Sequence, residues 1–249
     1  MNDLTPFQYQ YFGQEVIATH KSVGVHLHLF YGDLWEWFLP YIQNISYDFD
    51  LFVTITETQL NHSVADRVYA HYPKATIIHV PNKGLDVGPF LFVLNEIAQL
   101  NKSYDCILKL HSKKSLAHGE SLGNPWRKAL ADALLKDQTT FEIAFNNCIK
   151  HPTYKMAGSK NWVLKQEWVG YEAKYFTNLR PLESYFFVGG TMFLINFKLL
   201  MDWFTSQRIF ARFYDDMPEG YVGDGSTAHE LERVFGLLVY ATGNTIFES

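Results

Sequence analysis

The chain has 249 residues, 47% of them hydrophobic and 19% charged, a composition that supports a packed core and excludes a disordered or collagen-like chain. Its formal net charge of -5 argues against the basic surface of nucleic-acid-binding proteins, so no nucleic-acid partner is expected. Two cysteines, Cys106 and Cys148, are too few for a disulfide framework or a cysteine-based zinc site, which indicates a reducing, cytoplasmic environment.

The first half of the chain alternates between segments typical of strands and segments typical of helices. Apolar and β-branched residues predict strands at 23–31, 50–56, 75–80 and 104–110. Apolar residues at helical spacing predict the intervening helices at 33–45, 61–72 and 91–100. Strands separated by helices indicate an α/β fold with a Rossmann-type, mainly parallel sheet flanked by helices.

The second half is less regular. Helices are expected at 126–150 (one or two), at 197 to about 207 and at 227–240. Residues 184–195 resemble a buried strand that is broken near Gly189 and Gly190, whereas 151–184 give no clear assignment. Because no linker or repeat marks a boundary, we expect a single domain over residues 1–249 with a helical C-terminal part.

The connection after the third expected strand is the first candidate binding segment. Its residues are, in order, Asn82, Lys83, Gly84, Leu85, Asp86, Val87 and Gly88. Ligands of parallel sheets bind beyond the carboxyl ends of the strands, where glycines allow backbone amides to approach a phosphate or a ribose. The alternative is a tight connection in which the glycines satisfy turn geometry and Asp86 caps the next helix. The segment lacks the full dinucleotide-binding fingerprint, so both interpretations stay open.

A basic segment follows the fourth expected strand and contains His111, Lys113 and Lys114. Between Asn101 and Lys136 the otherwise acidic chain has seven Lys or Arg residues against three acidic ones. Cationic groups at the carboxyl end of a strand are well placed to neutralise a diphosphate. The alternative is a solvated basic loop without a ligand.

A late acidic segment is the third candidate. On a helix that begins near residue 227, His229, Glu232 and Arg233 share one face, and Asp224 precedes the helix. A carboxylate beside a histidine and an arginine is suited to act as a general base or to orient a ligand. The alternative is a capped helix with ordinary charge pairs.

Other signatures are missing from the sequence. The ten histidines show no metal-binding spacing, and His26 and His28 occupy alternate positions on one strand face, so no metal ligand is assigned. Neither a phosphate-binding P-loop nor the nucleophile elbow of α/β-hydrolases is found. The N-terminal residues do not resemble a signal peptide, and no stretch is apolar enough to span a membrane.

Taken together, these segments resemble the rhamnan synthesis protein F family of bacterial polysaccharide glycosyltransferases. The matching stretches are HLHLFYGDLW, FDLFVT, NKGLDVGPFL, YDCILKLHSKKS followed by Pro125-Trp126-Arg127, FFVGGTMFLI and DGSTAHELERVFGLL. Their order and spacing cover residues 23 to about 240. The resemblance implies a GT-A-like fold with a nucleotide-binding half at about 23–115 and an acceptor-side half at about 116–249.

The resemblance also implies a set of residues that bind the nucleotide sugar. This set comprises Thr54, Asn82, Lys83, Gly84, Asp86, Gly88, His111, Lys113, Lys114, Gly189 and Gly190. The His-x-Lys-Lys segment stands where many GT-A enzymes have an Asp-x-Asp metal motif. We therefore expect basic residues to neutralise the diphosphate, while a requirement for Mg or Mn stays open. Leu85 stands where the family often has an arginine. The contact of that arginine with the donor is therefore not expected here.

The implied reaction moves a sugar such as rhamnose from a nucleotide-diphosphate donor to a lipid-linked or oligosaccharide acceptor of a growing cell-surface polysaccharide. An alternative is a UDP-sugar donor such as UDP-galactose, and another is a non-catalytic glycan-binding or scaffold module. For an inverting reaction we prefer Asp224 over Glu232 as the base, because Arg233 would make Glu232 a weaker base. We expect a cytoplasmic protein, peripherally associated with the inner membrane or with other polysaccharide-assembly enzymes.

Overall fold

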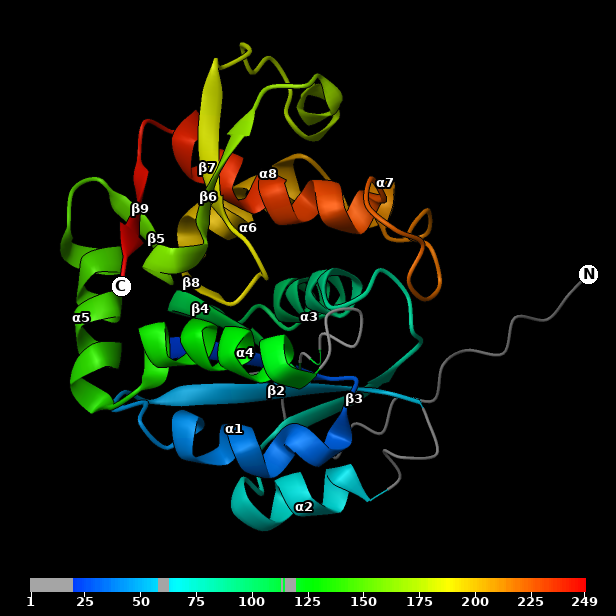
Figure 1. The fold of residues 1–249 in the computed structure, drawn as a ribbon, viewed down its shortest axis with the longest axis vertical. Coiled ribbons are helices and arrows are strands. Elements are labelled where there is room, and N and C mark those ends of the chain that lie inside the picture. Colours follow the sequence, from blue (N-terminus) through cyan, green and yellow to red (C-terminus); the bar gives the residue numbers. More distant parts are fainter. Residues whose placement is uncertain (1–19, 58–62, 113, 115–119) are drawn as a thin grey trace, which may run out of the picture.

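The computed structural model describes residues 20–57, 63–112, 114 and 120–249, without the side chains of 120–123. Its centre is a seven-stranded sheet of order β3-β2-β1-β4-β8-β5-β9 (Figure 1). The strands are β1 (His20–Leu29), β2 (Phe49–Thr56), β3 (Thr76–Val80), β4 (Ser103–His111), β5 (Tyr154–Gly158), β8 (Phe193–Asn196) and β9 (Thr245–Glu248). Strand β8 is antiparallel to β4 and β5, and the other pairs are parallel, which confirms the expected mainly parallel sheet.

Helices cover both faces of this sheet. One layer contains α1 (Trp35–Ile42), α2 (Val64–His71), α4 (Glu120–Leu135) and α5 (Gln138–Lys150). The other contains α3 (Val87–Gln99), α6 (Phe197–Ser206), α7 (Ile209–Phe213) and α8 (Thr227–Ala241). Short 3-10 helices lie at Gly32–Leu34, Lys160–Trp162 and Tyr171–Tyr175. Figure 1 shows α1 and α2 on the opposite side of β2 from α3 and α8, so the architecture is a layered α/β/α sandwich.

The composition of β1 explains why it lies in the interior. Val23, Val25 and Leu27 alternate along the strand and pack into the apolar cluster beneath α1 and α4. The intervening His26 and His28 point to the face covered by α3 and are also buried. A parallel strand that is covered on both faces is expected to carry few exposed residues.

Several elements differ from the sequence-based prediction, among them α3 and the strand expected at 184–195. Helix α3 begins at Val87 rather than at residue 91, because Pro89 lies in the first helical turn, where its missing N–H has no partner to lose. The strand expected at 184–195 is two strands in different sheets. Strand β7 (Ser184–Val188) pairs with β6 (Val163–Glu167) in a separate hairpin-like sheet, whereas β8 joins the central sheet.

The break between β7 and β8 has a clear backbone cause. Gly190 and Thr191 both have positive φ, 85° and 49°, so the chain turns sharply where a continuous strand would need extended residues. The unassigned segment 151–184 contains β5 and β6, and β9 was not predicted. The expected single-domain organisation over residues 1–249 stays a prediction.

Among the described residues, no helix has both the length and the apolar character needed to cross a membrane.

Candidate functional site

A row of buried polar side chains crosses three neighbouring strands on the face covered by α3. Its members are Thr54 on β2, His26 and His28 on β1, and Lys109 and His111 on β4, each at most 5% exposed. The strands are parallel, and His28 lies opposite both Thr54 and His111. These side chains therefore lie together in the carboxyl-terminal halves of the strands. The row lies where α/β proteins commonly bind ligands.

Asp86 closes one end of this row. Its carboxylate accepts hydrogen bonds from the Lys109 ammonium group and from the Thr191 hydroxyl. Nδ1 of His111 lies 3.9 Å from the other carboxylate oxygen. Asp86 is the N-cap residue of α3, but its side chain makes no capping hydrogen bond, so the carboxylate serves this polar cluster rather than the helix end.

The charges around Asp86 keep it ionised. Burial alone would raise the pKa of this carboxyl group, but the nearby His111 and Lys109 and the hydrogen bonds from Lys109 and Thr191 hold the pKa well below its usual range. The site therefore contains an ionised carboxylate that is stabilised by His111 and by the wholly buried Lys109.

The two histidines of β1 are held in the neutral form. Burial lowers the pKa of His28 to about 3 and the pKa of His26 well below its usual value. The Thr54 hydroxyl bridges them, at 2.9 Å from Nε2 of His26 and 3.0 Å from Nδ1 of His28. Because a hydroxyl has one proton, it can donate to only one of the two rings, so at least one ring N–H donates to it.

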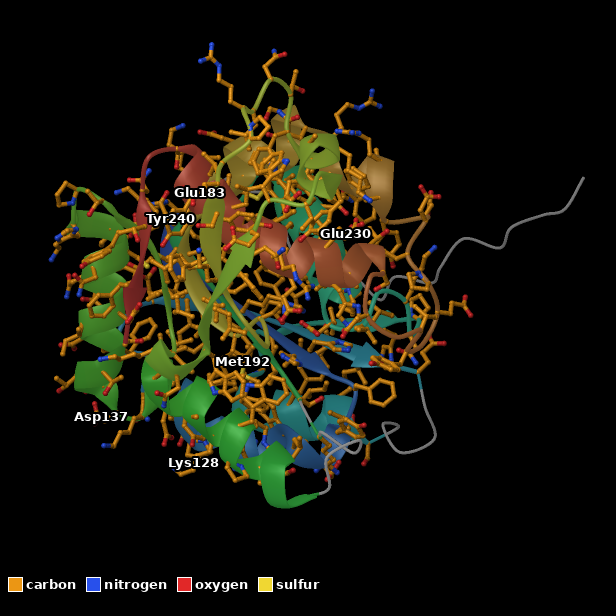
Figure 2. The ribbon with its side chains drawn as sticks, turned by 45° about the horizontal axis from the view of Figure 1, so that its top comes forward. Lys128, Asp137, Glu183, Met192, Glu230 and Tyr240 are labelled. Carbon is orange, nitrogen blue, oxygen red and sulfur yellow. The ribbon has the colours of Figure 1, made fainter. Side chains whose placement is uncertain are left out.

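The turn at Gly190 and Thr191 connects this row to α8. His111 donates its Nε2 proton to the Gly190 carbonyl oxygen over 2.7 Å, and the Gly190 N–H donates to Oε1 of Glu232 over 2.7 Å. Lys109 donates to both the carbonyl and the hydroxyl oxygen of Thr191. Met192, the next residue, is buried in the interior of the molecule (Figure 2).

A small cavity of about 70 Å³ lies at this junction. It is lined by Leu85, Asp86, Val87, Gly190, Thr191, Ala228, His229 and Glu232. Sequence segments from three parts of the chain thus meet there. The volume is well below the roughly 300–1,000 Å³ of typical ligand pockets, so a sugar or nucleotide would extend from this cavity across the adjoining surface.

The glycine-containing connection is held mainly by contacts within the protein. The Gly84 N–H donates to the Pro218 carbonyl oxygen over 2.9 Å, and the Gly88 N–H donates to the Gly84 carbonyl oxygen over 2.9 Å. A Cβ atom on Gly88 would lie 2.0 Å from the carbonyl oxygen of Lys83, so this glycine is needed for close backbone packing. The two glycine amides are therefore engaged by protein carbonyls, as the alternative turn interpretation requires.

Asn82 and Lys83 belong to the same connection and lie against the segment that follows α7. The Asn82 carbonyl oxygen accepts from the Gly220 N–H over 2.7 Å. The Lys83 ammonium group donates to the Asp215 carbonyl oxygen over 2.8 Å and lies over the Tyr214 ring. Both residues thus join the 82–88 connection to the loop before α8.

The basic segment is described only in part. Lys113 lies outside the described residues. Lys114 forms an ion pair with Asp33 and lies over the Tyr31 ring, with its side chain 32% exposed.

Gly189 precedes the turn at Gly190 and Thr191, and its N–H donates to the Trp162 carbonyl oxygen over 2.8 Å.

The late acidic segment separates into distinct environments. His229 and Glu232 both line the small cavity, whereas Arg233 donates to Gln166 of β6 and lies over the Phe187 ring. Asp224 has a side chain 86% exposed and lies 3.4 Å from Nε2 of His229. The structure thus places Glu232 in the cavity and Asp224 outside it.

The neighbouring carboxylate on α8, Glu230, faces a different part of the molecule. Glu230, which is labelled on α8 in Figure 2, accepts a hydrogen bond of 2.6 Å from the Tyr175 hydroxyl and pairs with Lys174. The two glutamates of this helix therefore have separate surroundings, and Glu232 is the one that faces the cavity.

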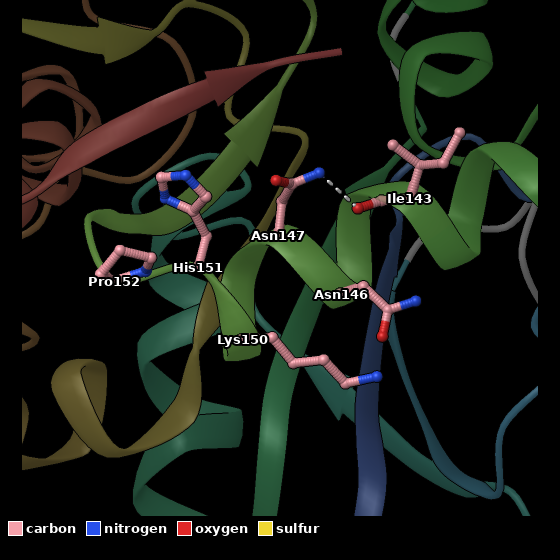
Figure 3. A pocket seen from close by; sticks show the side chains of 6 residues that line it. All are labelled: Ile143, Asn146, Asn147, Lys150, His151 and Pro152. Carbon is pink, nitrogen blue, oxygen red and sulfur yellow. Dashed lines mark hydrogen bonds between the residues drawn. The ribbon is translucent and has the colours of Figure 1, made fainter.

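A larger surface hollow of about 410 Å³ lies at the end of α5. Figure 3 shows its lining residues, Ile143, Asn146, Asn147, Lys150, His151 and Pro152. The Asn147 side-chain amide donates to the Ile143 carbonyl oxygen over 2.9 Å, as a local helix contact. None of the residues expected from the sequence lines this hollow, and we do not assign the site to it.

Sequence reasoning missed the residues at the centre of the network. Lys109 and Thr191 were not candidates, and His26 and His28 were considered only as metal ligands. A signal for Lys109 was present, because a lysine between the apolar Leu108 and Leu110 of a buried strand needs a buried partner. Thr191 had no comparable local signal.

Known proteins support the resemblance to a polysaccharide-synthesis family. The family model described as "Rhamnan synthesis protein F" matches residues 2–152. Two proteins named "Uncharacterized protein WxcX", from strain B100 and a second strain of Xanthomonas campestris pv. campestris, are each 27% identical over 233 residues. The alignments cover 90% of this chain and 32% of each relative, so the chain spans about a third of the relatives' length.

Proposed function

Because the chain belongs to the rhamnan synthesis protein F family, we propose that it is a glycosyltransferase domain that adds a sugar during synthesis of a bacterial cell-surface polysaccharide. The proposed donor is a nucleotide-diphosphate sugar, with dTDP-rhamnose as the first candidate and a UDP-sugar such as UDP-galactose as the second. The proposed acceptor is a lipid-linked or oligosaccharide chain. We also propose that the fold is GT-A-like, on the basis of the parallel strands β3-β2-β1-β4 followed by the antiparallel β8.

The donor side of the proposed site is the carboxyl end of the parallel strands. Asp86 lines the cavity there, and His111 lies beside Asp86. Lys114 lies three residues beyond the end of β4, which is a suitable position for a cation that meets a diphosphate. In this proposal Lys114 exchanges its exposed Asp33 partner for the diphosphate of the donor, and Lys113 contributes a second charge. The buried Lys109 instead holds Asp86 and Thr191 in place.

Glu232 is the proposed general base. A glycosyl acceptor hydroxyl is a weak nucleophile, and an inverting enzyme needs a positioned group that takes its proton as the new bond forms. Glu232 lies in the cavity, and the Gly190 N–H holds one of its carboxylate oxygens. Asp224, which we preferred from the sequence, is largely exposed and lies beside His229, so its proposed role changes to supporting that histidine.

The observation that supports this proposal most directly is the chain of contacts from Asp86 through Thr191 and Gly190 to Glu232. This series of contacts connects the carboxyl ends of the strands to a carboxylate on the proposed acceptor-side half. A donor site and an acceptor base must lie close to one another for direct transfer, and the geometry brings the two candidates to one cavity.

The test compares Glu232→Gln with Asp224→Asn in a transfer assay with dTDP-rhamnose and UDP-galactose. We expect Glu232→Gln to reduce kcat by about 100-fold or more while donor affinity stays unchanged, as for the loss of a general base. Asp224→Asn should retain transfer within a few-fold. The reverse pattern would move the base to Asp224, and donor binding without transfer or hydrolysis in the wild type would favour the glycan-binding module.

A further inference from the structure

The loop between α7 and α8 exposes two apolar side chains next to the cavity. Tyr221 is 73% exposed and Val222 is 58% exposed, and Tyr221 is the most exposed large apolar side chain of the described residues. Single exposed apolar residues are common on protein surfaces, so the position of this ring, rather than its exposure, carries the argument.

Tyr221 adjoins the residues that we assign to the reaction. Its ring centre lies 6.2 Å from that of His229, with the ring planes at 79°. His229 lines the cavity together with Glu232, and the neighbouring Gly220 is anchored to the Asn82 carbonyl oxygen. The loop is thus fixed on one side to the 82–88 connection and on the other to α8.

The charge of this loop limits which ligands its surface can accept. The loop and its approach contain Asp215, Asp216, Glu219 and Asp224, and no Lys or Arg occurs between residues 213 and 232. The structure also places Lys83 against this loop, at the Asp215 carbonyl oxygen, but the four carboxylates outnumber it. The surface therefore disfavours the diphosphate of a donor and the anionic headgroups of a membrane. Carboxylates beside an open aromatic ring instead suit a neutral ligand with many hydroxyl groups, which donate hydrogen bonds to the carboxylates.

We propose that Tyr221 is a specificity-determining residue of an acceptor subsite, where a neutral saccharide ring stacks its apolar face on the tyrosine and directs a hydroxyl group toward Glu232. This proposal rests on the proposed function. The small cavity holds only the reacting end of the acceptor, so the next part of the saccharide must cross its edge, where the Tyr221 ring provides a flat apolar surface.

The experiment measures saccharide and nucleotide binding separately. Ligand-observed NMR titrations use rhamnose, galactose and glucose trisaccharides with the wild type, Tyr221→Ala, Tyr221→Trp and Val169→Ala. Val169 is a matched control, because it is 63% exposed and follows β6 outside the cavity lining. Calorimetry with dTDP and UDP measures nucleotide affinity in each protein, and transfer assays give the acceptor KM and kcat.

We expect Tyr221→Ala to weaken binding of the best trisaccharide about tenfold, equivalent to about 1.4 kcal/mol, and to raise the acceptor KM more than it lowers kcat. Tyr221→Trp should restore binding, Val169→Ala should not change it, and dTDP or UDP affinity should be equal in all four proteins. The proposal is overturned if no trisaccharide binds the wild type or if Tyr221→Ala binds equally well.

Two further outcomes distinguish this proposal from others. If the wild type binds neither dTDP nor UDP, the proposed function is contradicted. The trisaccharide titration still tests the role of Tyr221 in that case. Binding to vesicles of phosphatidylglycerol and phosphatidylethanolamine that is lost in Tyr221→Ala, with unchanged trisaccharide affinity, overturns the proposal in favour of a membrane contact.

Discussion

The ammonium group of Lys109, which is completely buried in β4, donates a hydrogen bond to the carboxylate of Asp86 at the start of α3. The same ammonium group donates to the hydroxyl and carbonyl oxygens of Thr191. This single side chain therefore fixes the position of α3 relative to the turn that holds Glu232. A buried lysine costs desolvation energy, and its retention at this position is explained by the three oxygens that it organises.

The first prediction concerns the loss of this buried charge. Lys109→Met leaves the Asp86 carboxylate without its main partner, so we expect a loss of about 3–5 kcal/mol in the free energy of unfolding, measured by urea denaturation. Lys102→Met is the control, because Asp50 retains Lys21 as a partner, and the expected loss is about 1 kcal/mol or less. Adding Asp86→Asn to Lys109→Met should recover part of the stability, and equal losses in the two lysine variants would contradict the assignment.

The second prediction concerns pH. Burial holds the pKa of His28 at about 3 in the folded protein, whereas an unfolded histidine has a pKa of about 6.5. The unfolded chain therefore binds more protons between these values, so the folded state should be most stable above pH 6.5 and lose stability as the pH falls toward 3.

For His28 this loss is about 1–2 kcal/mol between pH 6.5 and pH 5, and His26 acts in the same direction. Urea denaturation at several pH values measures the slope. His28→Gln should have a smaller slope than the wild type, because the buried imidazole that it removes is the source of this part of the pH dependence. A slope that is unchanged in His28→Gln would show that the imidazole is not held neutral.

The third prediction concerns the turn before β8. A Cβ atom on Gly190 would lie 2.8 Å from Leu130 and 3.3 Å from the Trp126 ring, and the backbone has a φ of 85°. Gly190→Ala should therefore lower the free energy of unfolding by about 2–3 kcal/mol. It should also displace the N–H that holds Glu232 and thereby lower transfer activity. Gly243→Ala has a similar φ of 74° with nothing within 4 Å of the added atom.

The Gly243 variant separates backbone strain from crowding. Its free energy of unfolding should fall by only about 1 kcal/mol. Transfer activity should be kept, because Gly243 is not part of the cavity lining. Thermal unfolding and the transfer assay measure the two effects. If both alanine variants lose activity equally, the turn does not position Glu232.

The fourth prediction concerns the diphosphate. Lys114→Ala should weaken dTDP or UDP binding about tenfold or more and leave thymidine or uridine binding unchanged, because a charge-assisted contact contributes about 1.5–3 kcal/mol. Lys198→Ala removes an exposed lysine that pairs with Asp202 on α6 and serves as the control. Isothermal titration calorimetry compares the variants.

The same titration in the presence of EDTA tests metal dependence. If the lysines are sufficient to neutralise the diphosphate, chelation should leave the affinity unchanged. Loss of binding on chelation would assign part of the neutralisation to a divalent cation, and equal losses of diphosphate and nucleoside affinity in Lys114→Ala would exclude the proposed contact.

The first four strands and most helices were predictable from the sequence, because their signals are local, whereas β5, β6 and β9 were not predicted. The alternation in β1 and β2 and the apolar spacing of α6 and α8 each depend on residues within one element. The segments that carry Asp86, His111 and Glu232 were also recognised, because polar residues beside the ends of predicted strands and helices indicate ligand sites in α/β folds.

The sequence by itself therefore determined the α/β class, the family and the three segments that carry Asp86, His111 and Glu232. Only the tertiary structure decided which side chains act together. Thr191 lies 105 residues from its partner Asp86 and 82 from Lys109, and Glu232 lies 42 residues from Gly190. No local periodicity encodes such contacts, since they depend on the order of strands in the sheet and on the turn that takes the chain from β7 into β8. The same packing places Glu232 in the cavity and leaves Asp224 exposed, because a helix buries one face and the loop before it stays in solvent.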